Sequence, residues 1–437
     1  MRMSFRGLLA SSMTVAAALA AASPAIAAGD AGAVFVATNH NNRGDRSQPA
    51  NQVVMYGREA DGTLELEGRF DTGGQGSGPG QRFAGDGLGA GNSVRLSQDG
   101  RWLLVTNAGS NNVSVFRVKH DGLQLTDVAA TGDGSPDHRF PNSVTQHDDL
   151  VYVLNSADNG SITGFHLSDE GTLTPLAGST RGIAGNQHRF APDALYNPTQ
   201  ISFTPDGSKL VVSIKDGPAA GLIAGVTPTG PGRILVFDVG DNDRPSASFE
   251  QTDLANRGPF GFSFDRRGNL LVALFVGGGN EQVDGVDAIT GAAGSYRIEP
   301  DGSLTANTVA SGDHQLDTCW LVNNGRYAYG ANYSSGTISS WSIAKSGKLT
   351  LRESVAGKTD HPGNRQGSTP LDLRTCPDGR FLYLVEPGSG KVGAWRIAAD
   401  GRLIKLGEYA GLPQTIDGDQ APADFSALGS PAGIDVL

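Results

Sequence analysis

The stretch NSVRLSQDGRWLLVTNAGSNNVSVFRVKHDGLQLTDVAA, residues 92–130, decides the fold. Its apolar side chains recur at every second position, which is the period of a β-strand and not of a helix. Asp99-Gly100 and Asp121-Gly122 separate such runs, and an Asp-Gly pair favours a tight hairpin because glycine accepts a positive φ. The pattern predicts a four-stranded antiparallel meander with strands at 92–97, 101–107, 112–118 and 123–129.

This unit recurs along the chain. Its copies begin near Ala33, Asn92, Asn142, Pro198, Pro259, Asp317 and Pro370. A four-stranded repeat of about 50 to 60 residues is longer than a WD repeat, and units of this kind bury their faces by stacking around an axis. We therefore predict an all-β fold, a seven-bladed β-propeller of four-stranded antiparallel blades.

The two ends of the repeat array complement each other. The first copy lacks an innermost strand, whereas residues 431–437, PAGIDVL, read as an innermost strand with nothing after it. Pairing of these two ends would remove the open sheet edges that invite aggregation. We predict that the C-terminal strand closes the ring.

The N-terminal segment has the pattern of a secretory signal. Arg2 and Arg6 flank the start of an apolar run at 8–22, and residues 25–27, Ala-Ile-Ala, form a small-x-small cleavage site. We expect a signal peptide at residues 1–27, a single propeller domain at residues 28–437, and a periplasmic or secreted location. No later run is apolar for long enough to span a bilayer.

Charge and cysteine usage limit the possible partners. The formal net charge of −11 argues against a nucleic-acid partner, which needs basic surface. Cys319 and Cys376 either form a disulfide after export or are two buried apolar side chains. The sequence has no H-E-x-x-H, no G-x-S-x-G and no dinucleotide-binding loop before a helix. We expect no metal, no cofactor, and a monomer that binds a small anionic substrate.

Loop lengths distinguish two faces of the predicted ring. Connections between first and second strands, and between third and fourth strands, are short turns. The long connections all belong to the opposite face: 39–51, 71–91, 132–141, 181–197, 215–232, 277–291, 356–369 and 410–430. Because binding and catalytic residues concentrate in loops held by a rigid scaffold, we expect the functional site at this loop-rich face.

A basic and aromatic tripeptide recurs in three of these loops. The copies are Gln81-Arg82-Phe83, His138-Arg139-Phe140 and His188-Arg189-Phe190. One interpretation is an anion-recognising rim, because arginine binds carboxylate or phosphate through two N–H groups and histidine exchanges protons near neutral pH. The alternative is structural: the arginine caps loop carbonyl groups and the phenylalanine fills space between blades.

Other polar residues are expected at the same face. They are Lys215 and Asp216, Asn142, Gln200, His314, His361 and Glu386. His314 and His361 each follow an aspartate that could orient the imidazole ring, and the alternative for both is an exposed loop residue.

Three runs at the second strands carry a family resemblance: LLVTN at 103–107, VYVLN at 151–155 and FLYLV at 381–385, with S-x-D-G-type turns before them. They resemble the lactonase-type seven-bladed propellers with YVTN-style repeats, the group of 6-phosphogluconolactonase and carboxymuconate lactonizing enzyme. The resemblance covers the chain after the signal and implies a propeller that acts on lactones.

The family resemblance also implies a site of histidine, arginine and glutamate. In this sequence the three positions hold Asn142, Thr199 and Asp216, so only the last keeps its chemistry. His138, His188 and Arg189 lie close by in the sequence and are the candidates to replace the missing groups.

The leading hypothesis is an exported lactonase-like hydrolase. His188, or His138, would deprotonate the attacking water, with Asp216 orienting the histidine. Arg189 and Arg139 would stabilise the oxyanion or hold a substrate carboxylate. The substrate-binding candidates are Arg139, Arg82, Lys215, Asn142, Gln200, His314 and Glu386. The alternatives are a lactonizing (cycloisomerase-type) enzyme that runs the reverse chemistry, and a non-enzymatic envelope propeller that binds a ligand or partner.

Overall fold

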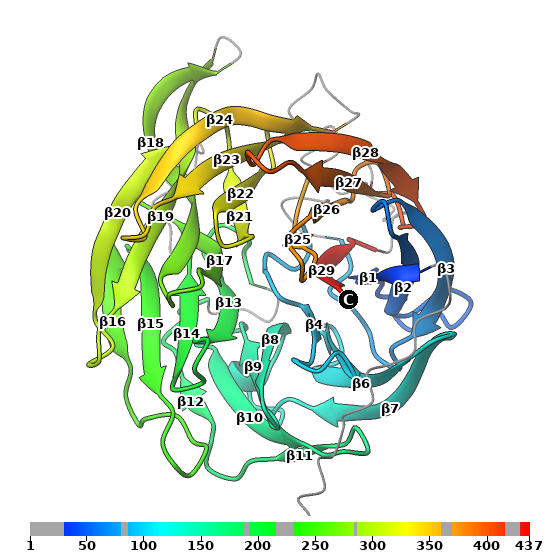
Figure 1. Cartoon of the computed structure of the whole chain (residues 1–437). Coiled ribbons are helices and arrows are strands. Elements are labelled where there is room, and N and C mark those ends of the chain that lie inside the picture. The colour runs from blue at the N-terminus through cyan, green and yellow to red at the C-terminus, as the bar shows by residue number, and fades with distance from the viewer. Residues whose placement is uncertain are drawn as a thin grey trace, which may run out of the picture.

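The computed structural model describes residues 30–79, 86–187, 192–215, 231–283, 286–359, 369–415 and 429–437. These residues form seven antiparallel sheets arranged around a central axis (Figure 1). The observed architecture confirms the predicted seven-bladed propeller of four-stranded blades. Blade 3 departs slightly, because its outermost strand is split into two short pieces that both pair with the third strand.

In blades 1 to 4 the strands are given from the axis outward. Blade 1 consists of β29 (Ala432–Val436), β1 (Asp30–Ala37), β2 (Gln52–Glu59) and β3 (Leu64–Asp71). Blade 2 consists of β4 (Val94–Leu96), β5 (Trp102–Asn107), β6 (Asn112–Lys119) and β7 (Gly122–Ala130). Blade 3 consists of β8 (Pro141–His147), β9 (Leu150–Asn155), β10 (Ser161–Leu167), β11 (Leu173–Pro175) and β12 (Arg181–Gly182). Blade 4 consists of β13 (Pro198–Phe203), β14 (Lys209–Ile214), β15 (Gly232–Asp238) and β16 (Glu250–Leu254).

The other three blades follow the same order. Blade 5 consists of β17 (Pro259–Phe264), β18 (Leu270–Val283), β19 (Val286–Ile298) and β20 (Leu304–Gly312). Blade 6 consists of β21 (Thr318–Asn323), β22 (Tyr327–Asn332), β23 (Thr337–Ile343) and β24 (Leu349–Lys358). Blade 7 consists of β25 (Leu373–Thr375), β26 (Phe381–Glu386), β27 (Lys391–Ile397) and β28 (Leu403–Ala410).

The C-terminal strand closes the ring, as the sequence predicts. β29 pairs antiparallel with β1, with Val34 opposite Val436 and Val36 opposite Ile434. The first blade therefore joins both ends of the described chain, and no innermost edge is left open there.

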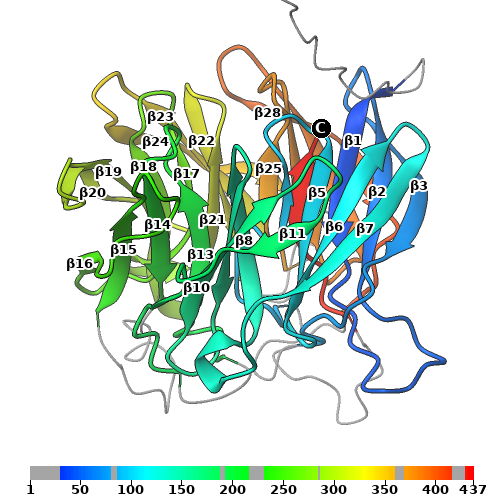
Figure 2. The same cartoon turned by 90° about the horizontal axis from the view of Figure 1, so that it is seen from below.

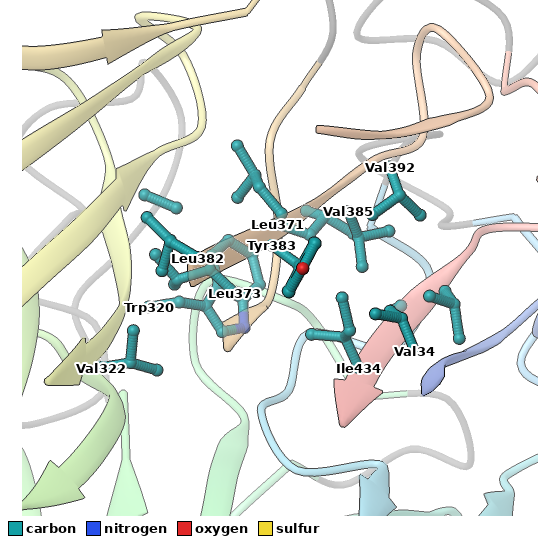
Figure 3. Packing of buried hydrophobic residues seen from close by; sticks show 14 of the residues in the cluster. Val34, Trp320, Val322, Leu371, Leu373, Leu382, Tyr383, Val385, Val392 and Ile434 are labelled. Carbon is teal, nitrogen blue, oxygen red and sulfur yellow. The ribbon is translucent and has the colours of Figure 1, made fainter. Parts of the chain in front are cut away.

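The hydrophobic core lies between blades. In the largest buried cluster, Trp320 of blade 6, Tyr383 of blade 7 and Ile434 of blade 1 pack together although they are far apart in sequence (Figure 3). Trp320 is 1% exposed, and Tyr383 and Ile434 are 0% exposed. Each sheet is apolar on both faces because each face meets a neighbouring blade, which explains why the second strands are buried along their whole length.

The two faces of the ring differ as expected. At one face, here called the plain face, tight turns join first to second strands, and Gly100, Gly207 and Gly379 adopt φ of 70°, 72° and 69° in equivalent turns. The C-terminus lies at this face, at the top of Figure 2, and long connections leave the opposite, loop-rich face. One expected loop is instead a β-ribbon: β18 and β19 continue beyond the ring, with residues 279–283 paired to residues 286–290 (Figure 1). An Asp-Gly pair at 284–285 was the sequence signal for this hairpin.

Two further expectations concern the cysteines and the N-terminus. Cys319 and Cys376 are free and buried, which is the second of the two alternatives. The expected signal peptide at residues 1–27 lies outside the described residues. Among the described residues, no helix is long and apolar enough to cross a membrane.

Candidate functional site at the loop-rich face

His138 is held by a carboxylate at the loop-rich face. It ends the short 3-10 helix η1 (Pro136–His138), and its Nδ1 lies 2.8 Å from Oδ1 of Asp133. The Ser135 amide donates to the same carboxylate, and this bond together with His138 lowers the pKa of Asp133 to about 2. Asp133 is therefore ionised at neutral pH and favours the His138 tautomer with its proton on Nδ1, which leaves the Nε2 lone pair available. Sequence reasoning missed Asp133 and assigned the orienting role to Asp216.

Arg139 has a structural contact in the same loop. Its Nε and Nη2 donate to the carbonyl oxygen of Gly134 at 2.9 and 2.6 Å. The next residue, Phe140, is 3% exposed and adopts a φ of 59°. In this copy of the tripeptide the arginine thus caps a loop carbonyl and the phenylalanine is buried.

His314 lies apart from His138, on the connection that leads into blade 6. Its Nδ1 is 2.7 Å from Oε2 of Glu281, on the projecting β18–β19 ribbon, and 58% of its side chain is exposed. The preceding Asp313 does not orient it, because that carboxylate accepts the Thr318 hydroxyl instead. Burial raises the pKa of Asp313 to about 6.

Lys215 is buried between aromatic rings. Its Nζ lies 4.5 Å from the centre of the Phe260 ring and 4.2 Å from that of Phe275, and it donates to the carbonyl oxygen of Ala194. Burial raises the pKa of the nearby Asp86, although the charge of Lys215 acts in the opposite direction. The side chain of Lys215 therefore stabilises the packing of blades 4 and 5 through cation–π contacts.

Asn142 and Gln200 join neighbouring blades. Asn142 Nδ2 donates to the Pro198 carbonyl at 2.8 Å. The Gln200 amide makes two bonds to the main chain of Phe262, as donor at 2.7 Å and as acceptor at 3.1 Å. Both side chains are buried, at 0% and 3% exposure, so their amide groups fix the first strands of blades 3, 4 and 5 relative to each other.

Glu386 occupies a position that is an asparagine in three other blades. Those asparagines end the second strand and donate to a hydroxyl on the third: Asn107 to Ser114, Asn155 to Thr163 and Asn332 to Ser339. In blade 7 the hydroxyl residue is replaced by Gly393, where a Cβ would lie 2.4 Å from Glu386 Oε1. The missing side chain makes room for the longer glutamate, which is 0% exposed and accepts a bond from Ser389.

The remaining candidates lie outside the described residues. They are His188, Arg189, Asp216, Arg82 and His361. The structure thus places His138, Arg139, His314, Lys215 and Glu386 in connections or strand ends of the loop-rich half, at blades 3, 4, 6 and 7.

The chain itself crosses the ring's centre near the loop-rich face. Residues 86–92, DGLGAGN, here called the plug, lead into β4 through the middle of the ring, as the light-blue trace in Figure 1 shows. The plug contacts blades 1, 3, 4, 6 and 7 through these hydrogen bonds: Gly87 N to Ser430 Oγ, Asn197 Nδ2 to Gly89 O, Trp320 Nε1 to Ala90 O, Gly91 N to Thr199 O, Asn92 N to Asp372 Oδ2 and Val144 N to Asn92 O. Leu88 is 2% exposed and Ala90 is 0% exposed. The plug therefore closes the axis at the loop-rich end, and any site there must be built from the loops around it.

The described residues contain no group of three or more His, Cys, Asp or Glu side chains that could hold a metal ion. The histidine–carboxylate pairs at His138 and His314 each bring together only two such groups.

Comparisons with known proteins place the chain in a family. The family described as "Lactonase, 7-bladed beta-propeller" matches residues 49–182 and 278–415, together more than half of the chain. A 6-phosphogluconolactonase from Yersinia enterocolitica is 25% identical over 339 residues, covering 70% of this chain and 94% of the relative.

Solved structures agree on the fold. A putative 6-phosphogluconolactonase from Bacteroides fragilis superposes with a TM-score of 0.60 at 14% identity, over 93% of this chain and 98% of that chain. A periplasmic gluconolactonase from Pseudomonas aeruginosa gives a TM-score of 0.60 at 15% identity, over 93% of this chain and 99% of the other. With the blade order, the ring closure and the family match in both halves of the sequence, the chain belongs to the seven-bladed β-propeller lactonase family.

Proposed function

We propose that this protein is an exported lactonase that hydrolyses a cyclic ester of an anionic or sugar-acid type at its loop-rich face. The observation that carries the proposal is the family match in both halves of the chain, together with a 6-phosphogluconolactonase relative that is matched over 94% of its length. The signal-like residues 1–27 and the likeness to a periplasmic gluconolactonase support export.

The reaction adds water across the ring ester. The water oxygen attacks the carbonyl carbon, the ring C–O bond breaks, and the ring oxygen takes up a proton to give a hydroxy acid. A histidine is suited to take the proton from the attacking water and return it to the leaving oxygen. His188 and His138 are the candidates for this role.

His138 has the geometry of an oriented base. Asp133 lies at Nδ1, and an ionised carboxylate there both fixes the tautomer and stabilises the imidazolium that forms when Nε2 accepts a proton. The pair is exposed to solvent, with 24% of the His138 side chain accessible, so water can reach it. In this proposal Asp133 serves His138 and Asp216 serves His188.

Arginines would bind the negative charges of the substrate and of the transition state. Arg189 is proposed to stabilise the oxyanion that develops on the carbonyl oxygen, and Arg82 to hold an anionic group of the substrate. Arg139 already donates from Nε and from one N–H of Nη2 to Gly134, so only the second N–H of Nη2 and the two of Nη1 remain for a substrate. The remaining binding candidates, Lys215, Asn142, Gln200, His314 and Glu386, would act by shaping the surrounding loops.

A substrate panel tests the proposal. Purified protein is incubated in a pH-stat with D-glucono-1,5-lactone, its 6-phosphate and δ-valerolactone, a lactone of the same ring size without hydroxyl or phosphate groups, and the acid released above the uncatalysed rate is recorded. We expect turnover of the two sugar lactones and slower turnover of δ-valerolactone. Absence of turnover on every lactone, with binding of the corresponding sugar acid retained, would support the non-enzymatic alternative instead.

A further inference from the structure

The inner strands become accessible only toward the plain face. Along each first strand of blades 2 to 7, the residues at the loop-rich end are buried and partial exposure begins near the plain end. The partly exposed inner residues are Arg95, Leu96, Gln146, His147, Ser202, Ser263, Phe264, Asn323, Arg374 and Thr375. Since the plug closes the other end, solvent reaches the inner strands from the plain face.

Arg95 is the most exposed charged side chain on the innermost strands at this end, with Arg374 second. Its side chain is 29% exposed, against 8% for its partner Asp435. Among the described residues its only ion pair runs from Nη1 to Asp435 Oδ2, at 3.2 Å. A guanidinium carries five N–H donors, so most of the hydrogen-bonding capacity of Arg95 is left for solvent or a solute.

Asp435 does not depend on Arg95 for its partners. Its Oδ2 also accepts the Leu96 amide at 2.8 Å, and its Oδ1 accepts the Val436 amide and lies 3.3 Å from Arg374 Nε. These bonds hold the closing strand β29 to blades 2 and 7. None of them uses the N–H groups of Arg95 that remain free.

Arg374 supplies a second positive charge beside Arg95. Its Nη2 donates to Asn92 Oδ1 of the plug at 2.7 Å, and 16% of its side chain is exposed. The acidic partners are less accessible than the arginines, since Asp372 is 4% and Asp435 is 6% exposed. Within this cluster of two arginines and two aspartates, the cations are therefore the more accessible groups.

We propose that the plain end of the ring's centre binds a small carboxylate or phosphate anion, with the free N–H groups of Arg95 as the principal donors and Arg374 as the second cation. Arginine matches both anions because its planar fork donates two parallel bonds to two oxygens. The site is separate from the loop-rich face, on the other side of the plug, and involves none of the residues proposed for lactone hydrolysis.

Isothermal titration calorimetry tests this site. The full-length mature protein is titrated with inorganic phosphate, D-gluconate and 6-phosphogluconate, and the same titrations are made with Arg95→Gln, Arg95→Lys and Arg396→Gln. Arg396 is an exposed arginine on β27 and serves as the matched control. Phosphate without gluconate binding assigns the site to phosphate groups, and the reverse assigns it to carboxylates.

We expect at least one of the three anions to bind the wild type and Arg396→Gln equally. Arg95→Gln should weaken that binding roughly 10- to 100-fold, the effect of losing charge-assisted hydrogen bonds. Arg95→Lys should show an intermediate loss, and it keeps the test valid if the glutamine variant fails to fold. Equal binding by wild type and both Arg95 variants, or no binding of any probe at millimolar concentration, would overturn the proposal. Because D-gluconate and 6-phosphogluconate are also the products of the proposed lactone hydrolysis, binding that the Arg95 variants leave unchanged is assigned to the loop-rich face. Only binding that Arg95→Gln weakens is assigned to the plain end, so failure of this proposal and failure of the proposed lactonase function are distinguishable.

Discussion

The two ends of the propeller axis are built in opposite ways. The loop-rich end is closed by the plug, whose backbone makes hydrogen bonds to five blades, and the inner residues beneath it are buried. The plain end has only short turns, yet there the inner strands are partly exposed and Arg95 faces solvent. Among the described residues, the long loops therefore do not lead to an open central mouth, because the plug closes the axis at that end. Chemistry at that face has to occur in the loops themselves.

Glycine makes the closed end possible. Gly87, Gly89 and Gly91 alternate along the plug, and at Gly89 and Gly91 the missing side chain lets the backbone approach neighbouring residues closely. A Cβ at Gly91 would lie 2.5 Å from Gln200 Oε1, and one at Gly89 would lie 2.8 Å from Asn197 Nδ2. At the plain end glycine instead serves the tight turns, where a Cβ at Gly207 would lie 2.5 Å from His147 Cε1.

The largest expected effect comes from removing the closing strand β29, which runs along the axis from the loop-rich end to the plain end. Deleting residues 430–437 removes β29, its ladder with β1 and the contacts of Asp435 with Arg95 and Arg374. We expect loss of cooperative thermal unfolding, measured by circular dichroism and calorimetry, because an open ring exposes two sheet edges and a large apolar cluster. A truncated protein that unfolds cooperatively within a few degrees of wild type would contradict the role given to this strand.

Asp372→Asn tests the polar group directly beneath the plug. Burial raises the pKa of Asp372 to about 6, although Arg374 acts in the opposite direction. The folded protein holds this proton more tightly than the unfolded chain, so ionisation lowers stability as pH rises from about 4 through 6. The stability of Asp372→Asn relative to wild type should therefore increase by up to about 3 kcal/mol between pH 4 and pH 7.

Urea unfolding at several pH values measures this difference. Asp313, whose pKa is also raised to about 6, is unchanged in the variant, and its contribution cancels in the comparison. A stability difference that does not change with pH would show that the Asp372 carboxyl titrates as it does in water.

Gly91→Ala tests the fit of the plug. The added methyl group would displace the Gln200 amide from its two bonds with Phe262. We expect a loss of about 2 kcal/mol in the free energy of unfolding, from crowding and from lost hydrogen bonds. Gly182→Ala is the control, because nothing lies within 4 Å of a Cβ there, and it should change stability by less than about 0.5 kcal/mol. Equal stabilities for the two variants would mean that the plug is loosely held.

The smallest effect concerns Glu386 and Gly393 at the loop-rich end of blade 7. Gly393→Ser alone should destabilise the fold by about 1–2 kcal/mol, because the new side chain meets both Glu386 Oε1 and the edge of the Trp395 ring. Glu386→Asn in the same chain should restore stability by recreating the asparagine–hydroxyl bond of blades 2, 3 and 6. A double-mutant cycle measures the coupling, and additive effects would show that the two positions do not compensate each other.

Local pattern was enough to predict the blades and their closure. The strands of residues 92–130 appear within two residues of their expected bounds, since alternation and Asp-Gly turns are short-range signals. The β18–β19 ribbon was expected as a loop, although its own Asp-Gly pair carried the same signal.

The arrangement of the site could not be predicted in the same way. The plug contacts residues more than 200 positions away, such as Trp320 and Asp372, and no periodicity reports such a pairing. Asp133 was five residues from His138 and could have been found from sequence, because an aspartate just before a 3-10 turn is within reach of its last side chain. The sequence pattern predicted Arg95 only as part of a strand. Its exposure to solvent depends on where the plug ends along the axis, which no local pattern reports.

The central functional claim is that a histidine at the loop-rich face catalyses lactone hydrolysis. The most direct measurement is the rate of D-glucono-1,5-lactone hydrolysis by wild type, Arg396→Gln and the double variant His138→Gln/His188→Gln, with folding of each checked by thermal unfolding. The account predicts equal rates for the first two proteins and a loss of roughly 100-fold or more in the double variant, as expected for removal of a general base. A folded double variant that hydrolyses the lactone at the wild-type rate would contradict it.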